Sequence, residues 1–101
     1  MIQIHKWTYS ENEHCVEEAF KNFVIGKEYD FETLITKLYI HFDGEIKKSS
    51  IIMKLQNIKY LLNMYNIPNT LMVSALENAS EDNKYAFLVI AKKYNKLFNK
   101  P

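Results

Sequence analysis

The sequence predicts an all-α protein that folds as a single compact orthogonal bundle of about five helices over residues 1–101. Apolar side chains recur at helical spacing, residues that favour helix caps precede those segments, and no segment shows convincing strand alternation. A short extended piece at residues 2–6 is the one candidate exception. With 48% hydrophobic and 14% aromatic residues, the chain can bury one core but is too short for a second domain.

The first two helices are predicted from capping residues and apolar stripes. Thr8 and Ser10 each precede a glutamate by three residues, which is a capping-box pattern, and we expect a helix over 9–25 before Gly26. Asp30 is the expected cap of a second helix that ends at Asp43-Gly44. The apolar stripe of this second helix contains Phe31, Leu34, Ile35, Leu38, Tyr39 and Phe42.

Three further helices are predicted in the second half of the chain. The third begins at Ser49 or Ser50 and ends before residues 66–69, where Pro68 disfavours helix. A shorter helix is expected over 71–79, and a last one from Glu81, capped by Ser80, to about Phe98. The inward positions of the third helix are Ile51, Leu55, Ile58, Leu62 and Tyr65, and those of the last are Phe87, Ile90, Tyr94, Leu97 and Phe98.

The third helix also carries polar groups suited to nucleic acid, and we expect it to be placed like the recognition helix of a helix-turn-helix protein. Lys47 and Lys48 precede its start, where free N–H groups favour an anion, while Lys54 and Lys59 flank the side opposite its apolar stripe. That side presents Met53, Gln56, Asn57, Tyr60, Asn63 and Met64. Amides can read base edges, but the same spacing also fits a core helix that buries Met53 and Tyr60 against its neighbours.

A resemblance to a known family follows from these residues. The chain contains Trp7-Thr8 followed by glutamates, and later Ser50-Ile-Ile-Met53-Lys54-Leu55-Gln56-Asn57-Ile58-Lys59-Tyr60-Leu61. Over about residues 7–87 it resembles the N-terminal helical module that precedes HNH nuclease domains in some restriction endonucleases and phage-borne proteins. The resemblance implies a DNA-associated module in which Ser50, Lys54 and Asn57 are the matched polar positions. The family usually has arginine or asparagine before the serine, where this chain has Lys48-Ser49.

The charges of the chain are unevenly distributed. Residues 1–45 contain nine acidic residues and four lysines, whereas residues 46–101 contain nine lysines and three acidic residues. Glu13, Glu17 and Glu18 on the first helix are candidates for contact with a basic protein partner. Two alternatives remain open: these glutamates form a solvated helix face, or the two halves interleave in space so that their fields cancel.

Composition and motifs argue against several other classes. All thirteen basic residues are lysine, so the bidentate reading of guanine by arginine is excluded, and the codon bias indicates a low-GC bacterium or its phage. Lone Cys15, the absence of an apolar run long enough to span a membrane, and a start without signal-peptide features predict a cytoplasmic protein with no membrane association. His5, His14 and His41 lack metal-ligand spacing, and no nucleotide-binding or catalytic motif is present, so we expect no enzyme, metal or cofactor.

The function predicted from the sequence is therefore a small non-enzymatic DNA-binding module of phage, mobile-element or restriction context, with double-stranded DNA as its partner. The residues expected to bind DNA are Lys47, Lys48, Ser50, Lys54, Asn57 and Lys59. The alternative, from another class, is a phage-encoded protein-binding inhibitor of a host defence nuclease, such as an anti-CRISPR or anti-restriction protein. In that case Glu13, Glu17 and Glu18 are the expected contacts.

Overall fold

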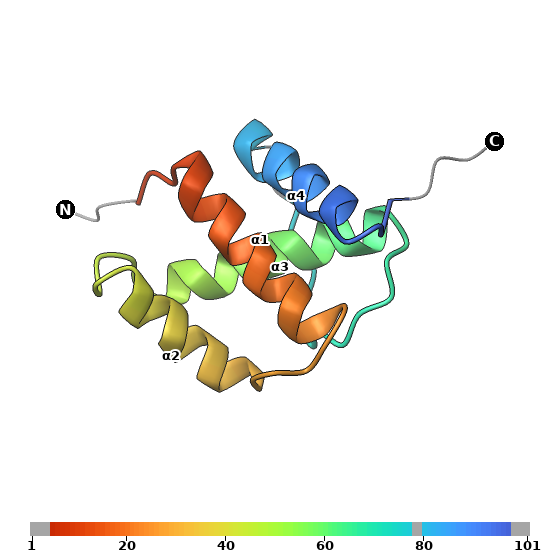
Figure 1. The fold of residues 1–101 in the computed structure, drawn as a ribbon. Coiled ribbons are helices and arrows are strands. Elements are labelled where there is room, and N and C mark those ends of the chain that lie inside the picture. Colours follow the sequence, from red (N-terminus) through yellow and green to blue (C-terminus); the bar gives the residue numbers. More distant parts are fainter. Residues whose placement is uncertain (1–4, 78–79, 98–101) are drawn as a thin grey trace.

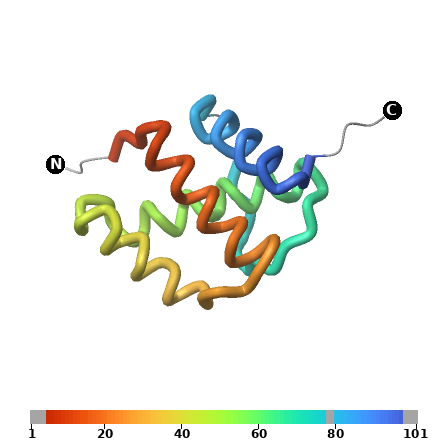
Figure 2. Tube along the Cα trace, viewed as in Figure 1, coloured from red at the N-terminus to blue at the C-terminus, as the bar shows by residue number. Residues whose placement is uncertain are grey.

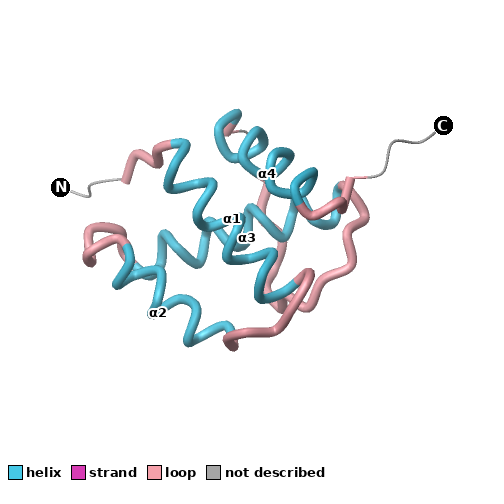
Figure 3. The backbone as a smooth tube through the Cα atoms, viewed as in Figure 1, coloured by secondary structure: helices cyan, strands magenta, loops and turns pink. Residues whose placement is uncertain are grey.

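The computed structural model describes residues 5–77 and 80–97, and within these ranges the chain forms four helices and no strand (Figure 1, Figure 3). The helices are α1 (Tyr9–Phe23), α2 (Phe31–His41), α3 (Lys48–Met64) and α4 (Glu81–Lys93). The all-α prediction is confirmed. Residues 2–4 of the expected extended piece lie outside the described ranges, and His5 and Lys6 have no regular structure.

Three helices begin at the predicted caps. The Glu11 amide donates to Thr8 Oγ1 (3.2 Å) and the Thr8 amide donates to the Glu11 carboxylate (2.9 Å), which completes the capping box of α1. Asp30 accepts a bond from the Thr33 amide (2.8 Å) at the start of α2, and Ser80 accepts one from the Asn83 amide (3.4 Å) at the start of α4. These bonds join residues three apart, so local sequence is enough to predict them.

The predicted start of α3 is wrong by one to two residues. Lys47 is the N-cap, no side chain of a described residue caps it, and Ser49 and Ser50 lie inside the first turn. The amides of Ser50 and Ile51 both donate to the Lys47 carbonyl, at 3.0 and 3.1 Å. The neighbouring residue Ile46 is only 1% exposed, and its insertion into the core fixes where the chain enters the helix.

The helix predicted over 71–79 is absent from its described part, residues 71–77, and residues 78–79 lie outside the described ranges. This segment bonds to other elements instead of to itself. The Thr70 amide donates to the Phe23 carbonyl (2.8 Å) and the Leu76 amide donates to the Gln56 carbonyl (3.0 Å). Leu71 is fully buried. The segment therefore extends from the end of α1 to the middle of α3, and tertiary contacts replace the helical hydrogen bonds.

The helix ends also differ from the expected boundaries. α1 ends at Phe23 rather than at residue 25, and α4 ends at Lys93, whereas the predicted end, Phe98, lies outside the described residues. Asn95 has a positive φ of 57°, and the Lys96 amide donates to the Ala91 carbonyl (2.8 Å). This left-handed turn terminates α4. α2 ends at His41 and is followed by Asp43 and Gly44, both with positive φ, close to the predicted stop.

α3 is the central helix of the bundle, since it contacts α1, α2 and α4. α1 lies across α3 and packs most extensively against α4, while α2 packs on α3 (Figure 1, Figure 2). The ring of Phe20 on α1 meets that of Phe87 on α4 edge to face, with centroids 5.5 Å apart. The radius of gyration, 13.1 Å, is close to the ~13 Å of a compact domain of this length. The largest fully buried side chains include Phe20, Leu34, Leu38, Leu55, Ile58, Leu62, Leu71 and Phe87.

Candidate functional site

The six residues predicted to bind DNA do not share one surface. Lys47 and Lys48 are exposed at the start of α3, and Ser50 is half-buried in its first turn. Lys54 and Asn57 are buried, and Lys59 is half-buried. Only the N-terminal end of the predicted surface is therefore free to meet a large ligand.

Lys54 is a core residue, which corrects its expected role as a phosphate contact. Its side chain is 3% exposed, and its Nζ lies 4.7 Å from the centroid of the Trp7 ring. Burial lowers the pKa of Lys54, because removal from water disfavours the charged form. A cation held over an aromatic ring inside the fold cannot also contact a phosphate on the surface.

Asn57 and Lys59 connect α3 to the segment that follows it. Asn57 is 6% exposed, and its Nδ2 donates to the Leu76 carbonyl at 2.7 Å. Lys59 Nζ donates to Asn69 Oδ1 at 2.8 Å. The base contact predicted for Asn57 does not fit its burial, and the phosphate contact predicted for Lys59 competes with its bond to Asn69.

The exposed end of α3 forms a compact basic surface. The first turn of α3 contains no acidic residue, and the first amides of a helix have no partner within it. Lys48 Nζ lies 5.4 Å from the centroid of the Tyr39 ring on α2, so this lysine is placed between the two helices. Ser49 is exposed, and Met53, one turn further along, is 53% exposed.

Two of the acidic residues of α1, Glu17 and Glu18, are paired with lysines. Glu17 accepts bonds from Lys93 Nζ at 2.9 and 3.1 Å and from the Tyr94 hydroxyl, and Glu18 pairs with Lys21 at 3.5 Å. Burial alone raises the pKa of Glu17, but the bonds from Tyr94 and Lys93 outweigh it and lower this pKa. The hydrogen bond to Glu17 raises the pKa of the Tyr94 hydroxyl to about 12. Charges from the two halves of the chain therefore interleave where α1 meets α4.

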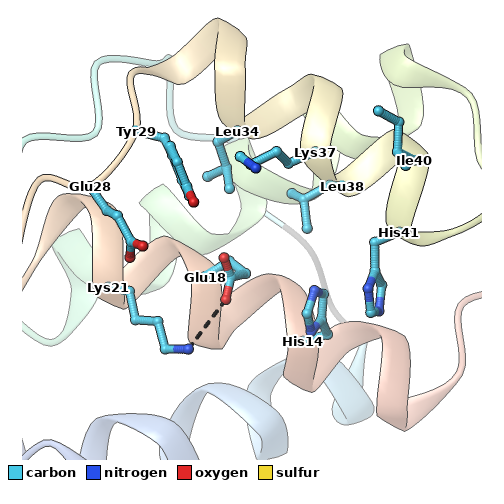
Figure 4. A pocket seen from close by; sticks show the side chains of 10 residues that line it. All are labelled: His14, Glu18, Lys21, Glu28, Tyr29, Leu34, Lys37, Leu38, Ile40 and His41. Atoms are coloured by element: carbon cyan, nitrogen blue, oxygen red, sulfur yellow. Dashed lines mark hydrogen bonds and ion pairs between the residues drawn. The ribbon is translucent and has the colours of Figure 1, made fainter.

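Two hollows lie between α1 and α2, and together they contain all three glutamates predicted to contact a protein. The larger, 410 Å³, contains Glu18, and the smaller, 340 Å³, contains Glu13 and Glu17. Figure 4 shows the larger hollow, with His14 and His41 at one end and Glu28 and Tyr29 at the other. Its lining is His14, Glu18, Lys21, Glu28, Tyr29, Leu34, Lys37, Leu38, Ile40 and His41, and that of the smaller is Ser10, Glu11, Glu13, His14, Glu17, His41 and Phe42.

A stacked pair of histidines lines both hollows. The rings of His14 on α1 and His41 on α2 are nearly parallel, with centroids 3.7 Å apart and an interplanar angle of 8°. Burial and then the nearby His41 lower the pKa of His14, whereas Glu18 and Glu17 partly oppose this shift. Sequence reasoning did not find this pair, because the two residues are distant in the chain and no local spacing connects them.

The described part of the chain contains no group of three metal-ligating side chains placed to hold an ion. Cys15 is fully buried, and burial raises the pKa of its thiol to about 12. Within residues 5–77 and 80–97, none of the helices has the length and apolar character needed to cross a bilayer.

The fold and these surfaces define a small helical domain with a basic helix end and a charged cleft. Comparison of the chain with protein-family models, curated proteins and solved structures found no match. Functional assignment therefore depends on the geometry of the chain itself.

Proposed function

We propose that this chain is a small non-enzymatic module that associates with double-stranded DNA through the N-terminal turn of α3. The observation that carries the proposal is the pair of exposed lysines, Lys47 and Lys48, at a helix start that no described side chain caps and whose first turn contains no acidic residue. The other three helix starts are each capped by an acceptor side chain. A phosphate accepts bonds from free helix amides and from lysine, so this end of α3 matches the DNA backbone.

The proposed contact is to phosphates rather than to bases. Lys54 and Asn57, two of the residues expected to read or grip DNA, are buried, and Lys59 is bonded to Asn69. Within the first two turns of α3, Ser49 and Met53 are also exposed, and they lie on one side of the helix. In the proposed helix-turn-helix-like arrangement, the turn at 42–47 places the N-terminal end of α3 against the duplex. Because the contact is to phosphates, we expect the chain to bind duplex DNA with little preference for its sequence.

The test is the salt dependence of binding to a random-sequence duplex, followed by fluorescence anisotropy. Two lysine–phosphate contacts give a slope of about −1.8 in log K against log salt, so affinity falls about tenfold between about 50 and 200 mM salt. Lys47→Gln and Lys48→Gln should each reduce that slope by about one. Lys92→Gln on α4 is the control, because Lys92 is also exposed and the charge change is the same.

Two outcomes would refute this proposal. One is an absence of duplex binding at about 50 mM salt. The other is an equal loss of affinity in Lys92→Gln and in the two α3 variants, which would indicate general attraction by net charge rather than a contact at the start of α3.

A second candidate function, inhibition of a DNA-acting nuclease through protein contact, is favoured by the placement of Glu13, Glu17 and Glu18 in the α1–α2 hollows. Carboxylates in a concave surface suit the basic surface of a nuclease. Converting all three to Gln should abolish inhibition of plasmid cleavage by purified restriction and CRISPR nucleases, and should tighten any DNA binding. Glu32→Gln, on an exposed position of α2, is the control. Because Glu17 is bonded to Lys93, a thermal melt must first show that the triple variant folds.

A further inference from the structure

The rings of Tyr9 and Tyr85 form an aromatic pair where α1 and α4 begin. Their centroids are 5.7 Å apart, and the rings are tilted by 59°. Tyr85 is 63% exposed, and Tyr9 is half-buried. Figure 1 shows the first turns of α1 and α4 at the same end of the bundle, so aromatic surface from both helices is available to a partner there.

Two carboxylates lie beside these rings. The Tyr9 hydroxyl donates to Glu13 Oε2 at 3.1 Å, and Asp82 is exposed in the first turn of α4. Burial, the bond to Glu13 and the negative charges of Glu13 and Asp82 raise the pKa of Tyr9. Within the described residues neither Glu13 nor Asp82 forms an ion pair, whereas Glu17 and Glu18 are paired with lysines. The pair of rings therefore lies beside two carboxylates that form no ion pair with a described residue.

Four other aromatic rings of the described residues have a lysine of the same chain beside them. Lysine Nζ atoms lie 4.5 Å from the ring centroid of Tyr29, 5.4 Å from that of Tyr39, 4.7 Å from that of Trp7 and 5.4 Å from that of Tyr94. In the part of the chain that the structure describes, no lysine lies over Tyr9 or Tyr85. These two rings thus combine exposure, adjacent carboxylates and the lack of an internal cation.

We infer that Tyr9, Glu13, Asp82 and Tyr85 form a docking surface for an arginine side chain on a basic segment of a protein partner. A guanidinium group stacks on aromatic faces and bonds to carboxylates at the same time, which matches both features of the surface. Nucleic acid does not fit, because Glu13 and Asp82 repel phosphates. The inference rests on the second candidate function, protein contact through the acidic helix, and names the residues that make this contact.

The surface is tested by titrating the protein with the peptide Ac-Arg-Arg-Arg-Arg-NH₂ at about 50 mM salt, using amide and tyrosine-ring NMR shifts. The largest shifts should occur at Tyr9, Glu13, Asp82 and Tyr85. Loss of one cation–ring contact at an exposed site corresponds to about a two- to fivefold weaker affinity, so Tyr85→Leu should weaken binding by this factor. Tyr85→Phe keeps the ring and should bind like the wild type.

Charge is tested separately from the ring. Asp82→Asn should weaken peptide binding, whereas Glu32→Gln, on an exposed position of α2, removes the same charge away from the rings and should not. Amide spectra of each variant confirm its folding. Equal affinities of Tyr85→Leu and the wild type would overturn the inference. NMR shifts centred on Glu28 and Glu32 would overturn the inferred arginine surface. They would still be consistent with protein contact through another acidic surface. Absence of any shift would count against both the surface and the second candidate function.

Discussion

Replacing Asn57 by Ala removes the side chain that joins α3 to the segment leading to α4. Its Nδ2 donates to the Leu76 carbonyl at 2.7 Å, and the residue is 6% exposed. Loss of a hydrogen bond made by a buried side chain, together with the packing of that side chain, costs about 1–3 kcal/mol. We expect the free energy of unfolding to fall by this amount. At about 4–8 °C per kcal/mol for a domain of this size, the melting temperature should fall clearly.

The assay is urea denaturation followed by circular dichroism, with duplex binding measured on the same variant. Asn63→Ala is the matched control, because Asn63 lies on the same helix and is exposed, and the change should cost less than about 0.5 kcal/mol. If Asn57 is structural, its replacement leaves the salt slope and the sequence preference of DNA binding unchanged. A variant that is as stable as the wild type but prefers different DNA sequences would refute this reasoning.

Three further predictions concern the core and its polar groups. Leu55→Ala, at a fully buried position of α3, should cost about 2–5 kcal/mol in urea denaturation. Asn83→Leu should stabilise the fold by about 1–3 kcal/mol, because the buried amide of Asn83 has no hydrogen-bond partner among the described residues. The pKa of His14 is lower in the folded state than its unfolded value of about 6.5. The free energy of unfolding should therefore be highest above pH ~6.5 and should fall as the pH decreases through the folded-state pKa. His41→Phe should make this decrease smaller, because it removes one cause of the shift.

Each of these predictions has a contradicting result. A loss well below about 2 kcal/mol in Leu55→Ala would mean that α3 is not central to the core. Destabilisation by Asn83→Leu would show that the asparagine is bonded in solution. For the histidines, the control is His5→Gln, since His5 pairs with Glu11 at 2.9 Å and is not part of the stack. If His5→Gln, rather than His41→Phe, changes the acid dependence, the stacked pair is not its origin.

The sequence by itself determined the helical class and most of the helix starts. Thr8, Asp30 and Ser80 each bond an amide three residues away, and such contacts depend on little beyond local sequence. Periodicity also identified core residues such as Leu38 and Leu55, because a helix face rich in apolar side chains must be buried somewhere.

Only the tertiary structure determined which polar residues of α3 reach the surface. An amphipathic pattern shows that one face is buried, but it does not show that α1, α2, α4 and the segment before α4 together contact most of α3. Because α3 is surrounded in this way, Lys54 and Asn57 are buried and have structural roles.

Long-range contacts also determined the features that no local pattern predicts. Residues 71–77 have apolar positions compatible with a helix, but a short isolated helix is only marginally stable. Instead, the Leu76 amide bonds to Gln56 in the middle of α3, and the adjacent Thr70 amide bonds to Phe23 at the end of α1. His14 meets His41, and Tyr9 meets Tyr85, because the packing of α3 with its neighbours brings separate helices together. The spacing of residues along the chain does not predict such contacts. The hollows between α1 and α2 and the proposed arginine surface can therefore be identified only in the folded structure.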